Sequence, residues 1–590
     1  MNPESIPRYE WKTLPWRKLE RAVFKLQKRI YQASLCGDVK LVRKLQRLLC
    51  NSWAAKCLAV RRVTQDNQGK KTAGVDGVKS LPPSQRFDLV NRIRLTCTAS
   101  PTRRVWIPKP HSQENRPLGI PTLEDRARQG LVKQVLEPEW EAKFEPNSYG
   151  FRPGRSCHDA VEAIFGYLKG QDKYVLDADI AQCFDRINHD ALLNKLNTSP
   201  TLRRQIRAWL KAGVMDGDQC FPTSEGTPQG GVISPLLANI ALHGMESLVK
   251  QISPTTGLIR YADDFVVLHK DLAIVQQCHQ AIAEWLTSLG LTLKPSKTTL
   301  THTRYSYEGK VGFDFLGFSF RHFPAGKYRS AKTSRGKILG FKTIISPSKQ
   351  SISTHIQRIQ QVITAHRGAP QVALIAHLAP IIRGWTQYFS TVCSAKVFDY
   401  LDHQITHSLI RWGRHRHSHS AIHWVVHKYW NTVENNNWRF MEANTRRLLP
   451  LYVDRSLRRH TKVKGSRSPY DGDWVYWSKR MSRYPLISNR VSILLKRQQG
   501  RCPICGLYFK DGDQLETDHV TPQKLGGQAG LDNLQLLHRH CHDVKTQGDW
   551  KLIKTHRRGV SDIHSIVEEP CAVKAASTVL KPSERGDSFA

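Results

Sequence analysis

The acidic residues best placed for chemistry are Asp263 and Asp264, which are adjacent in the run Tyr261-Ala262-Asp263-Asp264. Apolar, β-prone residues lie on both sides of this run, from Leu258 to Leu268, and predict a β-hairpin with two carboxylates at its tip. Adjacent carboxylates repel each other and cost stability unless positive charge lies beside them. Mg²⁺ is the expected neutraliser, because it prefers carboxylate oxygens and substrate phosphates as ligands.

A third carboxylate lies on a second apolar strand, expected at residues 173–180. Strand periodicity places Leu176 and Ala178 on one face and Asp177 and Asp179 on the other. Asp179 can therefore face the hairpin tip while the apolar side packs against helices. Two carboxylate-bearing strands side by side could hold two Mg²⁺ ions about 4 Å apart, the arrangement for in-line phosphoryl transfer.

A second group of reactive residues lies between positions 501 and 550. Cys502 and Cys505 form one pair with a two-residue gap and His538 and Cys541 form another, which is the spacing of a tetrahedral Zn²⁺ site. His540 is an alternative fourth ligand. Other polar residues lie between or beside these pairs: Asp518, His519, Asn533 and His542.

Composition restricts the kind of partner that this chain binds. The 590 residues carry a formal net charge of +39, which implies a polyanionic partner. Nucleic acid is favoured over a membrane surface, because no long apolar run or amphipathic anchor stands out. Three of the thirteen cysteines cluster late, which suggests reduced thiols plus a metal site. Without a signal-peptide core at the N-terminus, we expect a cytoplasmic protein.

Helical patterns elsewhere supply elements that would position these groups. Apolar residues recur at helical spacing within residues 16–62 and 352–362, and a further helix-like run begins at Pro380. A helix is expected from about Cys157, and residues 312–318 read as a β-hairpin.

The region 451–500 is strongly basic, with twelve Lys or Arg and three Asp, and Trp474, Tyr476 and Trp477 are interspersed. Positive charge with aromatic side chains suits DNA binding through phosphate contacts and stacking. A basic tether that only raises the local DNA concentration is the alternative. Residues 561–590 lose periodicity and are expected to be disordered.

The two carboxylate strands, read with Phe184 five residues after Asp179, resemble the palm motifs of a reverse transcriptase. The resemblance implies that Asp179, Asp263 and Asp264 are catalytic and that, together with Ile180, they bind Mg²⁺. Four further segments also match: residues 103–121 as a fingers hairpin, 149–156, 226–240 and 291–298.

The same resemblance implies five substrate contacts. Lys109 and Arg116 would lie against the incoming triphosphate, and Phe184 would pack beneath the sugar and exclude a 2′-hydroxyl. Gln229 would position template or nucleotide, and Lys294 would contribute near the pyrophosphate. The substrates implied are dNTPs.

Residues 501–550 resemble an HNH endonuclease with a zinc-stapled ββα-metal fold. The resemblance implies His519 as the general base, Asn533 orienting that base, and Asp518 and His542 as ligands of Mg²⁺ or Mn²⁺. The structural Zn²⁺ would be held by Cys502, Cys505, His538 and Cys541, with His540 as the alternative to His538.

Over roughly residues 15–550 the chain resembles a group II intron-encoded protein. The implied fold is multidomain α+β: a right-hand polymerase whose fingers and palm combine an antiparallel β-sheet with helices, an α-helical thumb or maturase domain, and a small zinc-stapled ββα-metal HNH domain. The expected boundaries are 1–80 for an N-terminal extension, 81–345 for fingers and palm, 346–450 for the thumb or maturase domain, 451–495 for a basic DNA-binding domain, 496–560 for the HNH domain and 561–590 for the tail.

The implied function joins three activities: RNA-directed DNA polymerisation, binding of the intron RNA to promote splicing and reverse splicing, and nicking of double-stranded target DNA to prime reverse transcription. Two other functions compete with it. One is an RNA-binding splicing cofactor with vestigial enzyme centres, and the other is a defence-type reverse transcriptase.

Overall fold

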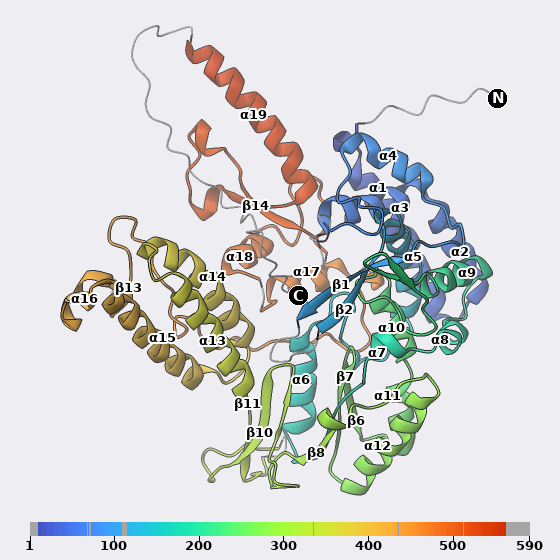
Figure 1. Ribbon diagram of the computed structural model, residues 1–590, viewed down its shortest axis with the longest axis horizontal. Helices are drawn as coiled ribbons and strands as arrows, with labels where there is room; N and C mark the ends of the chain where they lie inside the picture. Colours follow the sequence, from blue (N-terminus) through green and yellow to red (C-terminus); the bar gives the residue numbers. More distant parts are fainter. Residues whose placement is uncertain are drawn as a thin grey trace.

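The computed structural model describes residues 10–67, 69, 72–108, 115–333, 336–433, 436–485, 487–510 and 513–561 (Figure 1). Lys109 and the expected tail after residue 561 lie outside the described residues. No helix within the described residues is both long and apolar enough to cross a lipid bilayer.

The part of the chain before residue 310 is called here the polymerase-like half. A four-stranded antiparallel sheet of order β6-β7-β3-β8 lies at its centre. Its strands are β3 (Tyr174–Asp179), β6 (Gly257–Tyr261), β7 (Asp264–His269) and β8 (Thr299–His302). The strand predicted at residues 173–180 is β3, and the predicted hairpin is formed by β6 and β7, so both predictions are confirmed.

Both faces of this sheet are buried, because alternate residues of the same strands enter two different hydrophobic cores. Leu176 and Phe265 belong to one core, and Val175 and Val266 belong to the other. Strands buried on both faces need continuous apolar runs, which residues 265–268 provide. Helix α12 (Leu272–Thr287) contacts β3 and β7, while α6 (Cys157–Leu168) contacts β6. The sheet is therefore a rigid support for whatever lies at its edge.

The expected fingers hairpin is present as β1 (Thr102–Pro108) and β2 (Asn115–Ile120). Strand β1 also pairs in parallel with β4 (Val214–Asp216), which continues to β5 (Gln219–Phe221). The basic N-terminal segment folds as predicted into helices, α1 (Trp16–Leu35), α2 (Val39–Asn51) and α3 (Trp53–Arg61), and all three pack against α5 (Leu123–Glu141). Helix α4 (Pro83–Arg92) packs against α3. Five further helices complete this half: α7 (Cys183–Arg186), α8 (His189–Leu196), α9 (Pro200–Leu210), α10 (Ser234–Ala241) and α11 (Met245–Ile252).

The segment after residue 310 begins with a three-stranded sheet and continues with helices. Its elements are β9 (Phe313–Phe315), β10 (Phe318–Pro324), β11 (Phe341–Pro347), α13 (Lys349–Ala365), α14 (Gln371–Phe389), α15 (Ala395–Arg416), α16 (Ile422–Tyr429), β12 (Trp430–Val433) and β13 (Asn436–Phe440). The predicted start at Pro380 is wrong, because α14 begins at Gln371 and contains Pro380. Buried Leu374 and Leu378 extend its apolar face upstream, and that packing outweighs the cost of an internal proline.

The C-terminal region consists of α17 (Trp474–Ser482), α18 (Asn489–Arg497), β14 (Leu515–His519), β15 (Leu534–His538) and α19 (Arg539–Ser561). Strands β14 and β15 pair antiparallel and α19 packs on both, which is the expected ββα arrangement. Leu494 and Leu495 of α18 share one small core with Cys502 and Phe509. Helix α18 thus adds buried apolar side chains to the core that β14, β15 and α19 form. The far end of α19 extends away from the rest of the protein (Figure 1).

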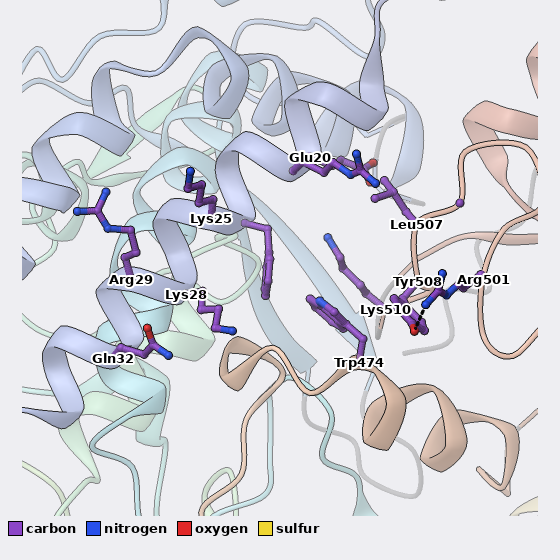
Figure 2. Close-up of a pocket in the computed structure, with 13 residues that line it drawn as sticks. Glu20, Lys25, Lys28, Arg29, Gln32, Trp474, Arg501, Leu507, Tyr508 and Lys510 are labelled. Atoms are coloured by element: carbon purple, nitrogen blue, oxygen red, sulfur yellow. Dashed lines mark hydrogen bonds between the residues drawn. The ribbon is translucent and has the colours of Figure 1, made fainter.

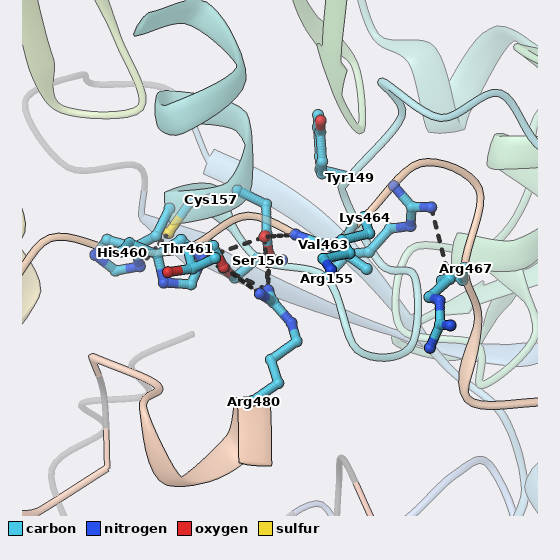
Figure 3. A network of polar contacts seen from close by, with 12 residues as sticks. Tyr149, Arg155, Ser156, Cys157, His460, Thr461, Val463, Lys464, Arg467 and Arg480 are labelled. Carbon is cyan, nitrogen blue, oxygen red and sulfur yellow. Dashed lines mark hydrogen bonds and ion pairs between the residues drawn. The ribbon is translucent and has the colours of Figure 1, made fainter. Parts of the chain in front are cut away.

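The buried carboxylate of Asp159, at the start of α6, joins the C-terminal region to the polymerase-like half. Figure 3 shows His460, Val463 and Arg480 of the C-terminal region beside Ser156 and Cys157 at the start of α6. The Asp159 carboxylate accepts hydrogen bonds from the His460 ring at 3.1 Å and from the Val463 backbone nitrogen at 2.8 Å, and Arg480 Nη2 lies 2.6 and 2.7 Å from its two oxygens. Burial alone would raise the pKa of Asp159, but the hydrogen bond from His460 and the charge of Arg480 lower it to about 2.

Two neighbours of Asp159 strengthen the same joint. The Arg155 guanidinium donates to the carbonyl oxygens of Gly465 and Arg467 at 3.2 and 3.3 Å. Gly154 has a positive φ of +71°, and a Cβ at this position would lie 2.5 Å from the Trp477 ring. The turn at residues 149–156 is therefore the surface on which the basic region docks.

Replacing Asp159 with Asn should detach this joint. The substitution leaves a buried Arg480 without its counter-ion, which costs roughly 3–5 kcal/mol of the free energy of unfolding. Trypsin should then cleave within residues 455–467 much faster than in the wild type. The contribution of Asp159 should be present above pH 3.8 and be lost as the pH falls toward about 2, because its folded-state pKa is depressed.

Asp190→Asn is the matched control, since that side chain is 82% exposed and 3.7 Å from Arg207. Its unfolding midpoint and cleavage rate should stay close to wild type. Equal resistance of the Asp159→Asn and wild-type proteins to trypsin would contradict the docking role.

Candidate active sites and metal cluster

The palm carboxylates meet where β3 and the β6–β7 hairpin run side by side. Asp179 ends β3, Asp264 begins β7, and the two residues are paired in register. Asp263 lies in the turn, and its carbonyl oxygen accepts a hydrogen bond from the Ile180 nitrogen at 3.3 Å. The side chain of Ile180 is apolar, so this residue could ligate a metal only through its backbone. The structure thus brings together all four predicted Mg²⁺ ligands.

The electrostatics of this cluster fit a site built for cations. Burial and then the charges of Asp179 and Asp263 raise the pKa of Asp264 to about 7, and burial also raises the pKa of Asp263. Lys297 Nζ lies 2.7 Å from Asp179 Oδ2. One ammonium group leaves three clustered carboxylates undercompensated, and hard divalent cations suit such oxygen ligands.

Arg260 and Gly150 fix the turn that carries Asp263. The fully buried guanidinium of Arg260 donates to the Ala262 carbonyl oxygen and to Asn239 Oδ1, both at 3.0 Å. Asn239 in turn donates to the Gly150 carbonyl oxygen at 2.8 Å. Ala262 has a positive φ of 58°, and a Cβ on Gly150 would overlap its backbone nitrogen. Burial lowers the pKa of Arg260 to about 10.

Four of the five predicted substrate contacts are described. Arg116 is exposed on β2, and its charge lowers the pKa of Asp263 against the effect of burial. Phe184 lies on α7 with its ring edge-on to Phe151, at 6.1 Å between centroids. The Gln229 amide donates to Oδ2 of Asp185, a residue of α7, at 2.8 Å. Of these three side chains, Arg116 acts on the carboxylates through its charge.

The remaining described contact, Lys294, approaches through its backbone, since its amide nitrogen donates to the Asp179 carbonyl oxygen at 2.8 Å. The ammonium that reaches the Asp179 side chain belongs instead to Lys297, at the end of the short 3-10 helix Pro295–Lys297. Sequence reasoning missed Lys297. Its signal was the second lysine of the same run, one helical turn after Lys294.

The ββα module brings Asp518 and His542 together. Asp518 lies at the end of β14, and His542 on α19 places Nε2 at 4.0 Å from Asp518 Oδ1. Lys545 Nζ lies 3.0 Å from the other oxygen of Asp518 and 2.5 Å from Asp549. His519 follows Asp518 on the strand. A carboxylate and an imidazole from two elements form the start of a divalent-metal site.

Asn533 does not contact the ring of His519 through any hydrogen bond among the described residues. Its side-chain amide donates to the carbonyl oxygens of Thr521 and Gln528 at 2.9 and 2.8 Å, and its Oδ1 accepts from the Thr521 nitrogen at 2.9 Å. Asn533 therefore closes the loop that follows His519. Any orientation of the base by Asn533 acts through this loop.

Cys502, Cys505, His538 and Cys541 place one ligand atom each within 4.8 Å of one another, and all four are buried. Three thiols and one imidazole form a donor set for tetrahedral Zn²⁺. His538 Nδ1 lies 3.3 Å from Cys505 Sγ, while its Nε2 lies 3.3 Å from Asp513 Oδ2. A carboxylate on the outer nitrogen is the usual support of a metal-bound histidine. Of the two alternatives, the structure therefore favours His538.

A Gly150→Ala substitution should displace the carboxylate turn, since the added methyl overlaps Ala262. We expect binding of Mn²⁺ at the palm, measured by electron paramagnetic resonance in a His542→Ala background, to weaken at least about tenfold. Gly166→Ala is the control, because a Cβ there meets nothing within 4 Å. It should retain Mn²⁺ binding and gain up to about 1 kcal/mol of stability. Unchanged binding by Gly150→Ala would contradict the positioning role.

Zinc content separates the two candidate histidines. His538→Ala should lose stoichiometric zinc, measured by atomic absorption, and should expose residues 487–541 to protease, because zinc binding supplies folding free energy to so small a module. His540→Ala should keep its zinc, since that ring stacks on His538 at 5.2 Å and the grouped ligand atoms are those of Cys502, Cys505, His538 and Cys541. Zinc loss in His540→Ala alone would reverse the assignment.

The chain matches four known family models. They are the N-terminal domain of reverse transcriptase over residues 11–93, reverse transcriptase (RNA-dependent DNA polymerase) over 107–320, the maturase-specific domain of group II introns over 352–430, and HNH endonuclease over 502–548.

Three relatives are similar to this chain over different shares of its length. Protein YkfC of Escherichia coli is 32% identical over 326 residues, which cover 47% of this chain and 82% of that protein. Group II intron-encoded protein LtrA of Lactococcus lactis is 43% identical over 192 residues, but these span only 32% of each chain. Maturase-like protein 1 of Euglena gracilis is 28% identical over 63% of this chain and 76% of its own length. The chain belongs to the group II intron-encoded proteins that combine a reverse transcriptase, a maturase-specific domain and an HNH endonuclease.

Proposed function

We propose that the chain binds its group II intron RNA, promotes splicing and reverse splicing, nicks double-stranded target DNA with its HNH domain and copies the intron into DNA from the nicked end. The observation that carries the proposal is the presence of two separate acidic centres in one chain. One is Asp179 with Asp263 and Asp264 at the edge of the palm sheet, and the other is Asp518 with His542 in the ββα module.

In the polymerase centre, Asp179, Asp263, Asp264 and the Ile180 carbonyl would hold two Mg²⁺ ions. Bound there, Mg²⁺ supplies charge neutralisation and activation of a hydroxyl for phosphoryl transfer. Lys297 and Arg116 bring positive charge to the triphosphate as it reacts, and Phe184 selects deoxynucleotides by excluding a 2′-hydroxyl. Lys109 and Lys294 are proposed to contact phosphate, and Gln229 to position template or nucleotide.

In the nuclease centre, His519 would accept the proton of the attacking water. Asp518 and His542 would hold Mg²⁺ or Mn²⁺, which neutralises charge on the scissile phosphate. Asn533 keeps the loop after His519 closed, so it acts as a positioning residue. Lys545, 3.0 Å from Asp518, would have to yield part of this ion pair when a metal binds.

The zinc cluster would be structural. Four protein ligands fill a tetrahedral site and leave no position for a substrate. Zn²⁺ would join the loop at residues 502–505 to the end of β15 and the start of α19, and so support the strand that carries His519.

Binding of intron RNA is supported by the match to the maturase-specific domain and by the net charge of +39. Double-stranded DNA and dNTPs are proposed as the other partners. Neither competing function is favoured. The catalytic carboxylates are intact, against a purely RNA-binding cofactor, and a maturase-specific domain with an HNH domain is unexpected in a defence-type reverse transcriptase.

A double dissociation of two activities tests the proposal. Asp263→Asn removes one charge with little change in shape and should lower extension of a DNA primer on an RNA template about 100-fold or more. The same variant should still splice its intron and nick the bottom strand of target DNA. His519→Ala should lower bottom-strand nicking about 10²–10⁴-fold and leave extension of a supplied primer unchanged.

Asp190→Asn and His423→Ala serve as matched exposed controls and should retain both activities. Full primer extension by the Asp263→Asn protein would contradict the assignment of Asp263 to the polymerase centre. Nicking at the wild-type rate by the complex of the His519→Ala protein with intron RNA would contradict the assignment of His519 as the general base.

A further inference from the structure

A cavity of about 490 Å³ lies between α1 and the C-terminal region (Figure 2). Its walls come from three segments far apart in sequence: residues 20–32 of α1, Trp474 at the start of α17, and residues 501–510 around the first zinc-ligand pair. This volume is within the range of about 300–1,000 Å³ that is typical of small-ligand sites. None of the residues assigned above to the polymerase or nuclease centres lines it.

Three aromatic rings, one from each segment, form a continuous wall. The rings of Phe24 and Trp474 lie 4.5 Å apart between centroids, tilted by 54°. Trp474 and Tyr508 lie 6.5 Å apart and nearly parallel, at 19°. All three side chains are only partly buried, so part of their ring surface stays accessible from the cavity. Such rings offer flat apolar surfaces on which an unpaired base can stack.

The cavity is also strongly cationic. Six Lys or Arg residues line it, against one acidic residue, Glu20, and that carboxylate is engaged by Arg61 at 2.7 Å. Across the described residues, none of the six cations is joined to a carboxylate by an ion pair of the structure. The six are Arg21, Lys25, Lys28, Arg29, Arg501 and Lys510.

Two of these cations lie against the aromatic wall. Lys510 Nζ lies 5.2 Å from the Phe24 ring centroid and 5.4 Å from that of Trp474. The Arg501 guanidinium lies 4.5 Å from the Tyr508 ring and donates to its hydroxyl at 2.6 Å. Figure 2 shows Lys25, Lys28 and Arg29 projecting from α1 on the opposite side. Unpaired cations gathered in one cavity repel each other, and a polyanion relieves that repulsion.

We propose that this cavity binds an unpaired stretch of nucleic acid, with a base stacked on the Phe24–Trp474–Tyr508 wall and its phosphates on the surrounding lysines and arginines. The proposal rests on the proposed function and deepens it. It assigns a binding site for single-stranded nucleic acid between the polymerase-like half and the C-terminal region. A single strand is favoured over a duplex, because base faces are accessible only when unpaired. An acidic peptide would neutralise the cations but would not stack on the aromatic rings.

The test measures binding by the full-length protein without added divalent ions, so that no catalysis contributes. Fluorescein-labelled (dT)12, (U)12 and a DNA hairpin duplex with the same number of phosphates serve as probes. Trp474→Ala should weaken binding of a single strand about tenfold and binding of the duplex less than twofold. Trp424→Ala is the matched control, since that tryptophan is exposed under Lys428 at 4.7 Å, on α16 outside the cavity.

The double variant Lys25→Ala/Arg29→Ala covers the case in which Trp474→Ala fails to fold, because both side chains are exposed on α1. It should reduce the slope of log affinity against log salt for single strands by about 1.4. Tighter binding of (dT)12 assigns the site to DNA and tighter binding of (U)12 to RNA, and either supports it.

Three results would overturn the inference: unchanged single-strand affinity in both variants, equal losses for single strand and duplex, or equally strong competition by a twelve-residue polyglutamate. Failure of the proposed function is seen separately, as wild-type protein that binds (dT)12 but neither extends a primer nor nicks DNA.

Discussion

Repulsion among Asp179, Asp263 and Asp264 sets the main physical demand on the polymerase half, because three carboxylates must stay together whether or not a cation is bound. The fold meets this demand with a sheet buried on both faces and a turn clamped by the buried Arg260. Burial also raises the pKa of Asp264 to about 7, so ionising the whole cluster costs folding free energy that bound cations offset. The neighbouring residues that support the turn, Gly150 and Asn239, are therefore as constrained as the acids.

The boundary between the polymerase half and the C-terminal region uses electrostatics in two opposite ways. At Asp159 a single buried carboxylate accepts hydrogen bonds from Arg480 and His460. This pairing suits a permanent joint. At the cavity beside α1, six cations gather against the single carboxylate of Glu20, and aromatic rings remain partly accessible. That arrangement is costly for a joint and suitable for an anionic ligand.

The palm carboxylates and the Cys–His cluster also differ in how they are supported. Asp179 and Asp264 lie on strands between two large cores and Asp263 lies in the adjoining turn, so the protein alone can hold them in place. The ββα module has only a small core, which depends on Leu494 and Leu495 of α18 and on the buried Cys502–Cys541 cluster. A small core of this kind is one that a structural metal would stabilise. Asp513 beside the outer nitrogen of His538 links the cluster to the surrounding loop.

Local chemistry of the sequence determined much of this protein. Strand alternation around Asp179, the Asp263–Asp264 hairpin and the helical spacing before residue 62 each depend on neighbours a few positions away, and all three predictions are confirmed. The start of α14 was misplaced, because tertiary packing outweighed the helix-breaking tendency of Pro380.

Contacts between segments far apart in the chain were decided only by the tertiary structure. Lys297 in place of Lys294 at Asp179, the packing of Gly150 against Ala262, and the docking of residues 460–480 on Asp159 are such contacts. So is the preference for His538 over His540, since both have plausible spacing and only the fold shows which ring faces the thiols. Spacing along a chain limits which residues can be ligands or neighbours, but the direction of a side chain is fixed by packing against distant residues.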